Sequence, residues 1–289
     1  MGLEQYSKAV QETAQNLRII DDALFRLVAE QKLVCQEILR TLLDMPELMV
    51  ESVTAQSVLK SMHREVTLDA HCIVKGGKHV DIEMQKGSGN DDILRTRFHA
   101  SALTAAYTPK GTEFSDIPEV AIVYITEYDA LGNGQIFTHV KRCMETGKGY
   151  VPVTDREDIY FASTAVKDES DRSRLLQLFL RKDAFEDKAY PELSRAVTYF
   201  KTTEGGYEKV CKTVEDYAKA FAKDYAEDYG RQCRIEGRRE GRREGWREEQ
   251  ENLISRMLSS GKTPEEIAEF TGIALEEVEA VEASLCAEV

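Results

Sequence analysis

Apolar residues recur at helical spacing near the start of the chain. From residue 17 to residue 44 they return every three or four positions, which predicts an amphipathic helical region. Residues 66 to 86 change to strict alternation and predict two strands. A further helix is expected from about residue 90 to residue 107, because Asn90 and the two aspartates after it suit a helix N-terminus.

The pattern changes again beyond these segments. Residues 120 to 126 are an almost uninterrupted apolar run of strand length, which predicts a strand covered on both faces. A short strand is expected at residues 135 to 140, after a glycine-containing turn. From about residue 170 the spacing is helical, with a second amphipathic stretch over residues 207 to 229. Strands are therefore expected only in the first part of the chain.

Residues 231 to 251 are a biased segment in which Glu-Gly-Arg-Arg repeats with a period of four. Glu and Arg three positions apart support a helix, whereas the glycines weaken it. Two interpretations stay open: an exposed helical linker, or an arm that forms oligomers or touches phosphates. After it, two short helices around Thr271-Gly272 resemble a helix-turn-helix fragment, but the second is acidic and suits a packing or partner module better than DNA reading.

These changes in pattern divide the chain into four expected regions. They are a core over residues 1–165, a helical region at 166–230 that packs on or extends the core, the charged repeat at 231–251, and a small helical module at 252–289.

Charge and composition narrow the function classes. The 289 residues are 42% hydrophobic and 31% charged, which is typical of a globular protein. The formal net charge of −14 argues against unspecific nucleic-acid binding, so any such contact needs a local cation or basic cluster. We expect no membrane span and no export signal. The six scattered cysteines include no CxxC pair and indicate reduced thiols in a cytoplasmic protein.

Candidate chemistry lies in the two alternating segments, which are joined by Gly76-Gly77 and predict a β-hairpin. One face of the first strand is expected to carry Val66, Leu68, Ala70, Cys72 and Val74. One face of the second strand is expected to carry the acidic and amide side chains of Asp81, Glu83 and Gln85.

A hairpin centred on Gly76 places Asp69 opposite Glu83, with Cβ atoms roughly 4.5–5.5 Å apart. Like charges at this separation raise one another's pKa or require a cation. Mg²⁺ and Mn²⁺ prefer such oxygen ligands, and both assist phosphodiester hydrolysis. The alternative is an ordinary amphipathic hairpin whose acidic face is solvated.

The pattern of Asp69 followed fourteen positions later by Glu83-Met84-Gln85 resembles the Asp…Glu-x-Gln variant of the PD-(D/E)XK nuclease signature. The chain more narrowly resembles the recombination-promoting nuclease and transposase family of bacteria. Further segments carry this resemblance over roughly residues 17 to 250: Asp22-Ala23-Leu24-Phe25-Arg26, Val80 to Gln85, Arg95-Thr96-Arg97-Phe98-His99, and the Glu-Gly-Arg-Arg repeats.

The resemblance implies an α/β (α+β) fold, a restriction-endonuclease-like mixed sheet flanked by helices with a helical C-terminal extension. It implies that Asp69, Glu83 and the backbone carbonyl of Met84 bind Mg²⁺ or Mn²⁺. Gln85 occupies the catalytic position where the wider superfamily has Lys. Since Gln can orient groups only by hydrogen bonds, the metal would then carry more of the charge stabilisation.

Several side chains near this motif have two interpretations each. Arg95 and Arg97 either hold DNA phosphates or form a solvated helix face paired with the aspartates before them. Asp81 and Glu37 are candidate additional acids, although Glu37 on an amphipathic helix needs no special reason. His71 is either a general base or a surface histidine on a strand.

Two function hypotheses follow. The first is a Mg²⁺-dependent DNA endonuclease of the bacterial cytoplasm that hydrolyses phosphodiester bonds and is linked to recombination or mobile elements. The alternative is a catalytically weak or inactive nuclease-fold protein that acts as an oligomeric interaction scaffold through its C-terminal helices.

Overall fold

The computed structural model describes residues 3–59, 65–87 and 91–287, and the chain divides into two compact units, Met1–Ala218 and Lys219–Val289. The first unit begins with a short 3₁₀ helix η1 (Leu3–Gln5) and then holds the elements α1 (Lys8–Asn16), α2 (Asp22–Ala29), α3 (Lys32–Leu43), β1 (Val50–Leu59), β2 (Val66–Val74), β3 (His79–Gln85), α4 (Asp92–Ala106), η2 (Phe114–Asp116), β4 (Val120–Thr126), β5 (Phe137–Val140), β6 (Cys143–Thr146), β7 (Gly149–Pro152), β8 (Glu157–Ser163), α5 (Asp171–Leu178) and α6 (Pro191–Thr202). Helix α7 (Glu204–Ser259) begins in this unit.

The first unit is built around a six-stranded mixed sheet of order β1-β2-β3-β4-β8-β5. Strands β3, β4 and β8 run parallel, whereas β1, β2 and β5 join antiparallel at the two sides. The predicted hairpin, the helix after it and the crossover to the strand at 120–126 are confirmed. All seven residues of β4 are buried, as expected for a strand covered on both faces. The mixed sheet flanked by helices confirms the expected fold class.

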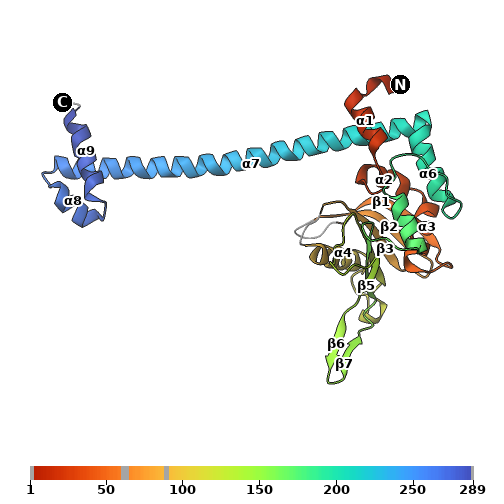
Figure 1. The fold of residues 1–289 in the computed structure, drawn as a ribbon. Coiled ribbons are helices and arrows are strands. Elements are labelled where there is room, and N and C mark those ends of the chain that lie inside the picture. Colours follow the sequence, from red (N-terminus) through yellow and green to blue (C-terminus); the bar gives the residue numbers. More distant parts are fainter. Residues whose placement is uncertain (1–2, 60–64, 88–90, 288–289) are drawn as a thin grey trace. The chain divides into compact units, whose positions relative to one another are not determined.

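Two apolar cores lie on opposite faces of the sheet. The larger core joins the sheet to α2, α3, α5 and α6, and the start of α7 adds Val210 and Cys211 to it. The smaller core joins the other face to α4 through Ala100 and Leu103. Figure 1 shows α4 beside one face of the sheet, with α2, α3 and α6 on the other side. Any side chain of β3 that points toward α4 is therefore enclosed between a strand and a helix.

The helical boundaries differ in detail from the prediction. The region expected at residues 17 to 44 forms two helices, because Gln31 is extended and its carbonyl accepts the first hydrogen bonds of α3 from Val34 and Cys35. Helix α4 begins at Asp92, and Asn90 lies outside the described residues. Strands β1 and β8 were not predicted, since their polar residues weaken the alternation.

The expectation that one face of β2 carries all five apolar residues is wrong. Ala70 and the apolar residues after it pack in the larger core, whereas Val66 and Leu68 pack in the smaller one. The ladder with β1 is interrupted where Gln56 faces Asp69, and Gln56 adopts a left-handed backbone with φ of +52°. Asp69 therefore lies between the residues that pack in the smaller core and those that pack in the larger one.

The second unit is a small helical module. The end of α7, with α8 (Pro264–Thr271) and α9 (Leu275–Ala287), encloses a core of Ile254, Ile267 and Val278. Thr263 and Glu266 form a reciprocal capping box at the start of α8, and Gly272 ends it with φ of +72°. The expected pair of short helices around residues 271 and 272 is thus confirmed. The charged repeat is helical, because α7 continues through it. In the described part of the chain, no helix has the length and apolar character needed to cross a membrane.

Candidate active site

Asp69 and Glu83 meet where β2 and β3 stop pairing. The register pairs Ala70 with Ile82 and His71 with Asp81, so the predicted alignment of residue 69 with residue 83 is the next step of the same ladder. At that step, hydrogen bonds from backbone N–H groups to the two carboxylates replace the hydrogen bonds between the strand backbones. The Asp69 N–H donates to Oε2 of Glu83 at 3.4 Å, and Oδ2 of Asp69 accepts from the N–H of Met84 at 2.9 Å. Both carboxylates are therefore held by the ends of the two strands.

Two further residues approach Asp69 from other elements. The Gln56 side chain donates to Oδ1 of Asp69 at 3.2 Å and to Oδ1 of Asp22 at 3.4 Å. Asp22 is the first residue of α2, so this helix brings its N-terminus to the acidic pair. Sequence reasoning noticed Asp22 only within a motif, and it missed Gln56, for which nothing in the strand pattern is a signal.

Burial raises the pKa of each acid in this group. The pKa of Asp69 rises to about 7, chiefly because of burial, with the nearby charges of Asp22 and Asp81 adding to it. Burial followed by the charges of Asp81 and Asp69 raises the pKa of Glu83 well above its usual range. Burial likewise raises the pKa of Asp22 and of Asp81. Such a group favours protonation or a bound cation, and it does not fit the alternative of a solvated acidic face.

A second grouping of ligand-type atoms involves His99 on α4. Its Nδ1 lies 3.6 Å from Oδ2 of Asp81 and 3.7 Å from Oε2 of Glu83. One ligand atom from each of the three residues lies within 4.8 Å of the others. Both carboxylate oxygens of Asp81 and the His99 Nδ1 lack a hydrogen-bond partner among the described residues. Sequence reasoning included His99 only in the segment from Arg95 to His99 that carries the family resemblance, although its position on the helix after β3 was a usable signal.

The polar and basic residues predicted nearby lie at the edge of this region. The amide of Gln85 donates to the carbonyl of Gly87 at 2.8 Å. Arg95 forms an ion pair of 3.7 Å with Asp91 one helical turn earlier, and its positive charge also acts to lower the pKa of Glu83. Arg97 is exposed on the same helix. The structure thus brings the charge of Arg95 near Glu83 and leaves Arg97 exposed to solvent.

Glu37 and His71 are engaged in other interactions. Both carboxylate oxygens of Glu37 accept hydrogen bonds of 2.9 Å from the N–H groups of Glu192 and Leu193, so Glu37 caps the start of α6. His71 is buried, which corrects the interpretation of a surface histidine. Its Nε2 lies 2.9 Å from Nδ1 of His79, and burial followed by His79 lowers its pKa to about 4.

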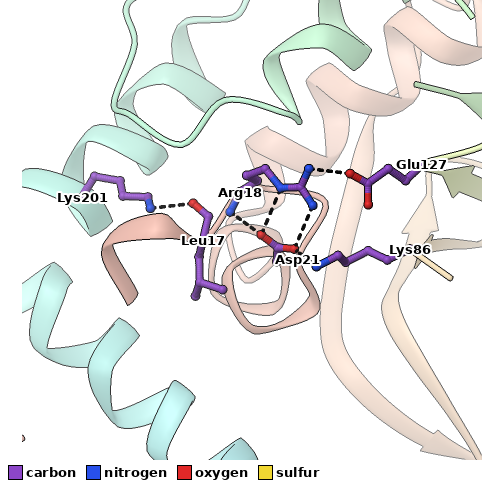
Figure 2. Close-up of polar contacts among 6 residues, drawn as sticks. All are labelled: Leu17, Arg18, Asp21, Lys86, Glu127 and Lys201. Atoms are coloured by element: carbon purple, nitrogen blue, oxygen red, sulfur yellow. Dashed lines mark hydrogen bonds and ion pairs between the residues drawn. The ribbon is translucent and has the colours of Figure 1, made fainter. Parts of the chain in front are cut away.

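A charged network fastens the ends of β3 and β4 to the segment before α2 (Figure 2). Asp21 accepts from the Lys86 ammonium at 2.5 Å and from the Arg18 N–H at 2.6 Å, and the Arg18 guanidinium also reaches Glu127. Burial opposes the ionisation of Asp21, but the Lys86 and Arg18 hydrogen bonds hold its pKa below the usual value. Lys201 donates to three carbonyls at the end of α1. Because Lys86 directly follows Gln85 and Asp21 precedes Asp22, this network positions both sides of the acidic group.

Comparison with known proteins gives a family match that covers the sheet and the acids of β2 and β3. A family model described as PD-(D/E)XK nuclease family transposase matches residues 24–177, which is more than half of the chain. The matched range contains all six strands of the sheet together with Asp69, Asp81, Glu83 and His99. No curated protein and no solved structure matches the chain.

Proposed function

This chain belongs to the family of PD-(D/E)XK nuclease transposases, and we propose that it is a Mg²⁺-dependent DNA endonuclease linked to recombination or mobile elements. The observation that supports the proposal most strongly is the contact between Asp69 and Glu83 at the ends of two strands. Two buried carboxylates with raised pKa values are costly for the fold unless they share a cation. A role in metal-assisted hydrolysis explains why the protein keeps two carboxylates that destabilise its metal-free fold.

The donor set fits a hard divalent ion. Asp69, Glu83 and the Met84 carbonyl are oxygen ligands from adjacent strands, the type that Mg²⁺ and Mn²⁺ prefer. When bound, such an ion polarises a phosphoryl oxygen and lowers the pKa of a coordinated water. Gln56 and the Met84 N–H orient the Asp69 carboxylate, so the chain presents this ligand in a fixed position.

We propose that Arg95 supplies the positive charge that Lys supplies elsewhere in the superfamily. Gln85 carries no charge, and it bonds to the carbonyl of Gly87. Arg95 supplies a permanent positive charge that acts on Glu83 from the first turns of α4. We assign Arg95 to the phosphate at the cleaved bond and the exposed Arg97 to a neighbouring backbone phosphate of the DNA.

Nicking of supercoiled plasmid in Mg²⁺ or Mn²⁺ tests the proposal. We expect Asp69→Asn and Glu83→Gln to abolish nicking, while Glu37→Gln, the same chemical change at the carboxylate that caps α6, retains it. Equal nicking by the wild type and the Asp69→Asn/Glu83→Gln double variant would show that the cleavage comes from elsewhere. The absence of nicking by the wild type with every DNA form tried would leave the scaffold function in its place.

One observation favours that second function. In the second unit Trp246 and Phe270 are 67% and 80% exposed, and with Leu253 they line one pocket. Exposed aromatic residues of this kind are typical of interaction surfaces. We propose that the C-terminal helical region mediates homo-oligomer formation. Light scattering on the wild type and a Trp246→Ala/Phe270→Ser variant tests it, and a monomeric wild type at micromolar concentration contradicts it.

A further inference from the structure

We infer that Asp81, Glu83 and His99 form a binding site for a divalent transition-metal ion such as Mn²⁺, Co²⁺ or Zn²⁺. The site shares Glu83 with the proposed Mg²⁺ site but adds an imidazole ligand from α4. It does not depend on the proposed nuclease activity, because it rests on three side chains whose arrangement is seen directly.

The distances between the three side chains suit a single ion. The His99 Nδ1 lies 3.6 Å from the nearest Asp81 oxygen and 3.7 Å from the nearest Glu83 oxygen. Ligands about 2.0–2.2 Å from a metal lie roughly 3.3–3.6 Å apart in a tetrahedral site and about 3 Å apart at adjacent octahedral positions. Both His99 distances lie close to this spacing, and the three ligand atoms all lie within 4.8 Å of one another, so side-chain rotation can bring them onto one ion.

The same distances exclude hydrogen bonds from the His99 imidazole to the two carboxylates. Separations of 3.6 and 3.7 Å are longer than a hydrogen bond between nitrogen and oxygen. Asp81 is fully buried, and within the described residues neither of its oxygens has a hydrogen-bond partner. A buried carboxylate without a donor is strongly unfavourable, and native proteins rarely contain one. A shared cation satisfies Asp81 and the His99 nitrogen together.

The elements that carry the ligands are rigid. Asp81 and Glu83 are two positions apart on β3, so both side chains lie on the same face of the central sheet. Ala100, next to His99, packs with Leu103 in the smaller core and holds α4 against that face. The side chains of Glu83 and His99 are still 10% and 11% exposed, which gives an ion and one exchangeable ligand a route from solvent.

The ligand types decide which metals the site prefers. An imidazole beside two carboxylates suits first-row transition metals, whereas Mg²⁺ prefers oxygen ligands and retains its waters. The Asp69 group has oxygen ligands alone, and His99 is absent from it. The inference therefore predicts that the protein discriminates between Mg²⁺ and transition metals through one residue, His99.

Metal binding to the full-length protein tests the inference without reference to cleavage. Co²⁺ titration followed by visible absorption and Mn²⁺ pulsed EPR report the ligand field and a directly bound nitrogen. We expect His99→Gln and Asp81→Asn to weaken Co²⁺ binding at least about tenfold and His99→Gln to remove the nitrogen coupling. Mg²⁺ affinity, measured by calorimetry, should change little in His99→Gln. Circular dichroism confirms folding, and His99→Asn is a second variant should His99→Gln fold poorly.

Asp69→Asn separates this inference from the proposed function. It should retain the Co²⁺ spectrum and the nitrogen coupling although it loses nicking, because Asp69 is not among the three ligands. Co²⁺ or Mn²⁺ binding by the wild type that lacks nitrogen coupling, or that His99→Gln leaves unchanged, overturns the inference even if nicking is intact. Binding that depends on His99 in a protein without nicking supports the inference while the nuclease proposal fails.

Discussion

Oδ2 of Asp69 accepts a 2.9 Å hydrogen bond from the backbone N–H of Met84, the residue directly after Glu83. The Asp69 carboxylate accepts this hydrogen bond in place of a backbone carbonyl, at the point where β2 and β3 stop pairing. The Asp69 carboxylate is thus fixed by the backbone of β3, while the Asp69 N–H donates to the Glu83 side chain. This contact explains how two like-charged groups are kept together in a buried location.

Removing the charge of Asp69 should stabilise the metal-free protein. Its folded pKa of about 7 lies above the ordinary value of 3.8, so stability present at low pH is lost as the pH rises through about 7. We expect Asp69→Asn to raise the free energy of unfolding by about 1–2 kcal/mol at pH 8, and to have a smaller effect at pH 5. Urea denaturation in EDTA measures both. A variant less stable than the wild type at pH 8 contradicts the account of the acidic group.

His71 should make the protein sensitive to acid. Its folded pKa of about 4 is below the ordinary value of 6.5, so the folded state binds fewer protons between these limits and stability falls as the pH drops. The loss approaches about 3 kcal/mol for a group that stays neutral to pH 4. The difference in unfolding free energy between wild type and His71→Gln, followed from pH 7 to pH 4, isolates this contribution from that of the carboxyls. A pH-independent difference contradicts it.

Glu37 should matter for stability and not for metal binding. Its carboxylate accepts two backbone N–H groups at the start of α6, a charge-assisted cap of about 1–2 kcal/mol. Glu37→Gln retains one acceptor, so we expect a loss of roughly 1 kcal/mol in thermal or urea unfolding. The Mg²⁺ and Co²⁺ affinities should equal those of the wild type. A tenfold loss of metal affinity would instead place Glu37 in the site.

Asp21 should contribute more to the stability of the fold than Lys86 does. The Asp21 carboxylate accepts from both Lys86 and Arg18, whereas the Lys86 side chain is 51% exposed. Asp21→Asn leaves two cations with a weaker partner, and we expect a loss of about 1–3 kcal/mol. Lys86→Gln should cost less than about 1 kcal/mol because its ion pair is half solvated. Thermal unfolding of the two variants side by side checks the order, and the reverse order contradicts it.

Local pattern was sufficient for the centre of the sheet. Alternation and the Gly76-Gly77 turn predicted the hairpin and its register, because the two-residue period of a strand and a short turn leave few alignments. The apolar run of β4 predicted burial on both faces for a similar reason. The strands β1 and β8 were not found, since each mixes polar with apolar residues and is stabilised mainly by the strands that pair with it.

The sequence alone determined the family resemblance, the order of the main elements and the alignment of residue 69 with residue 83, because these features depend on short-range spacing. Only the tertiary structure decided which other groups meet the acids. Gln56 comes from the neighbouring strand β1, His99 comes from α4, and Glu37 accepts hydrogen bonds at the start of α6 instead. Such encounters depend on how helices pack across a sheet, and that packing follows from the apolar cores as a whole rather than from the spacing of any one segment.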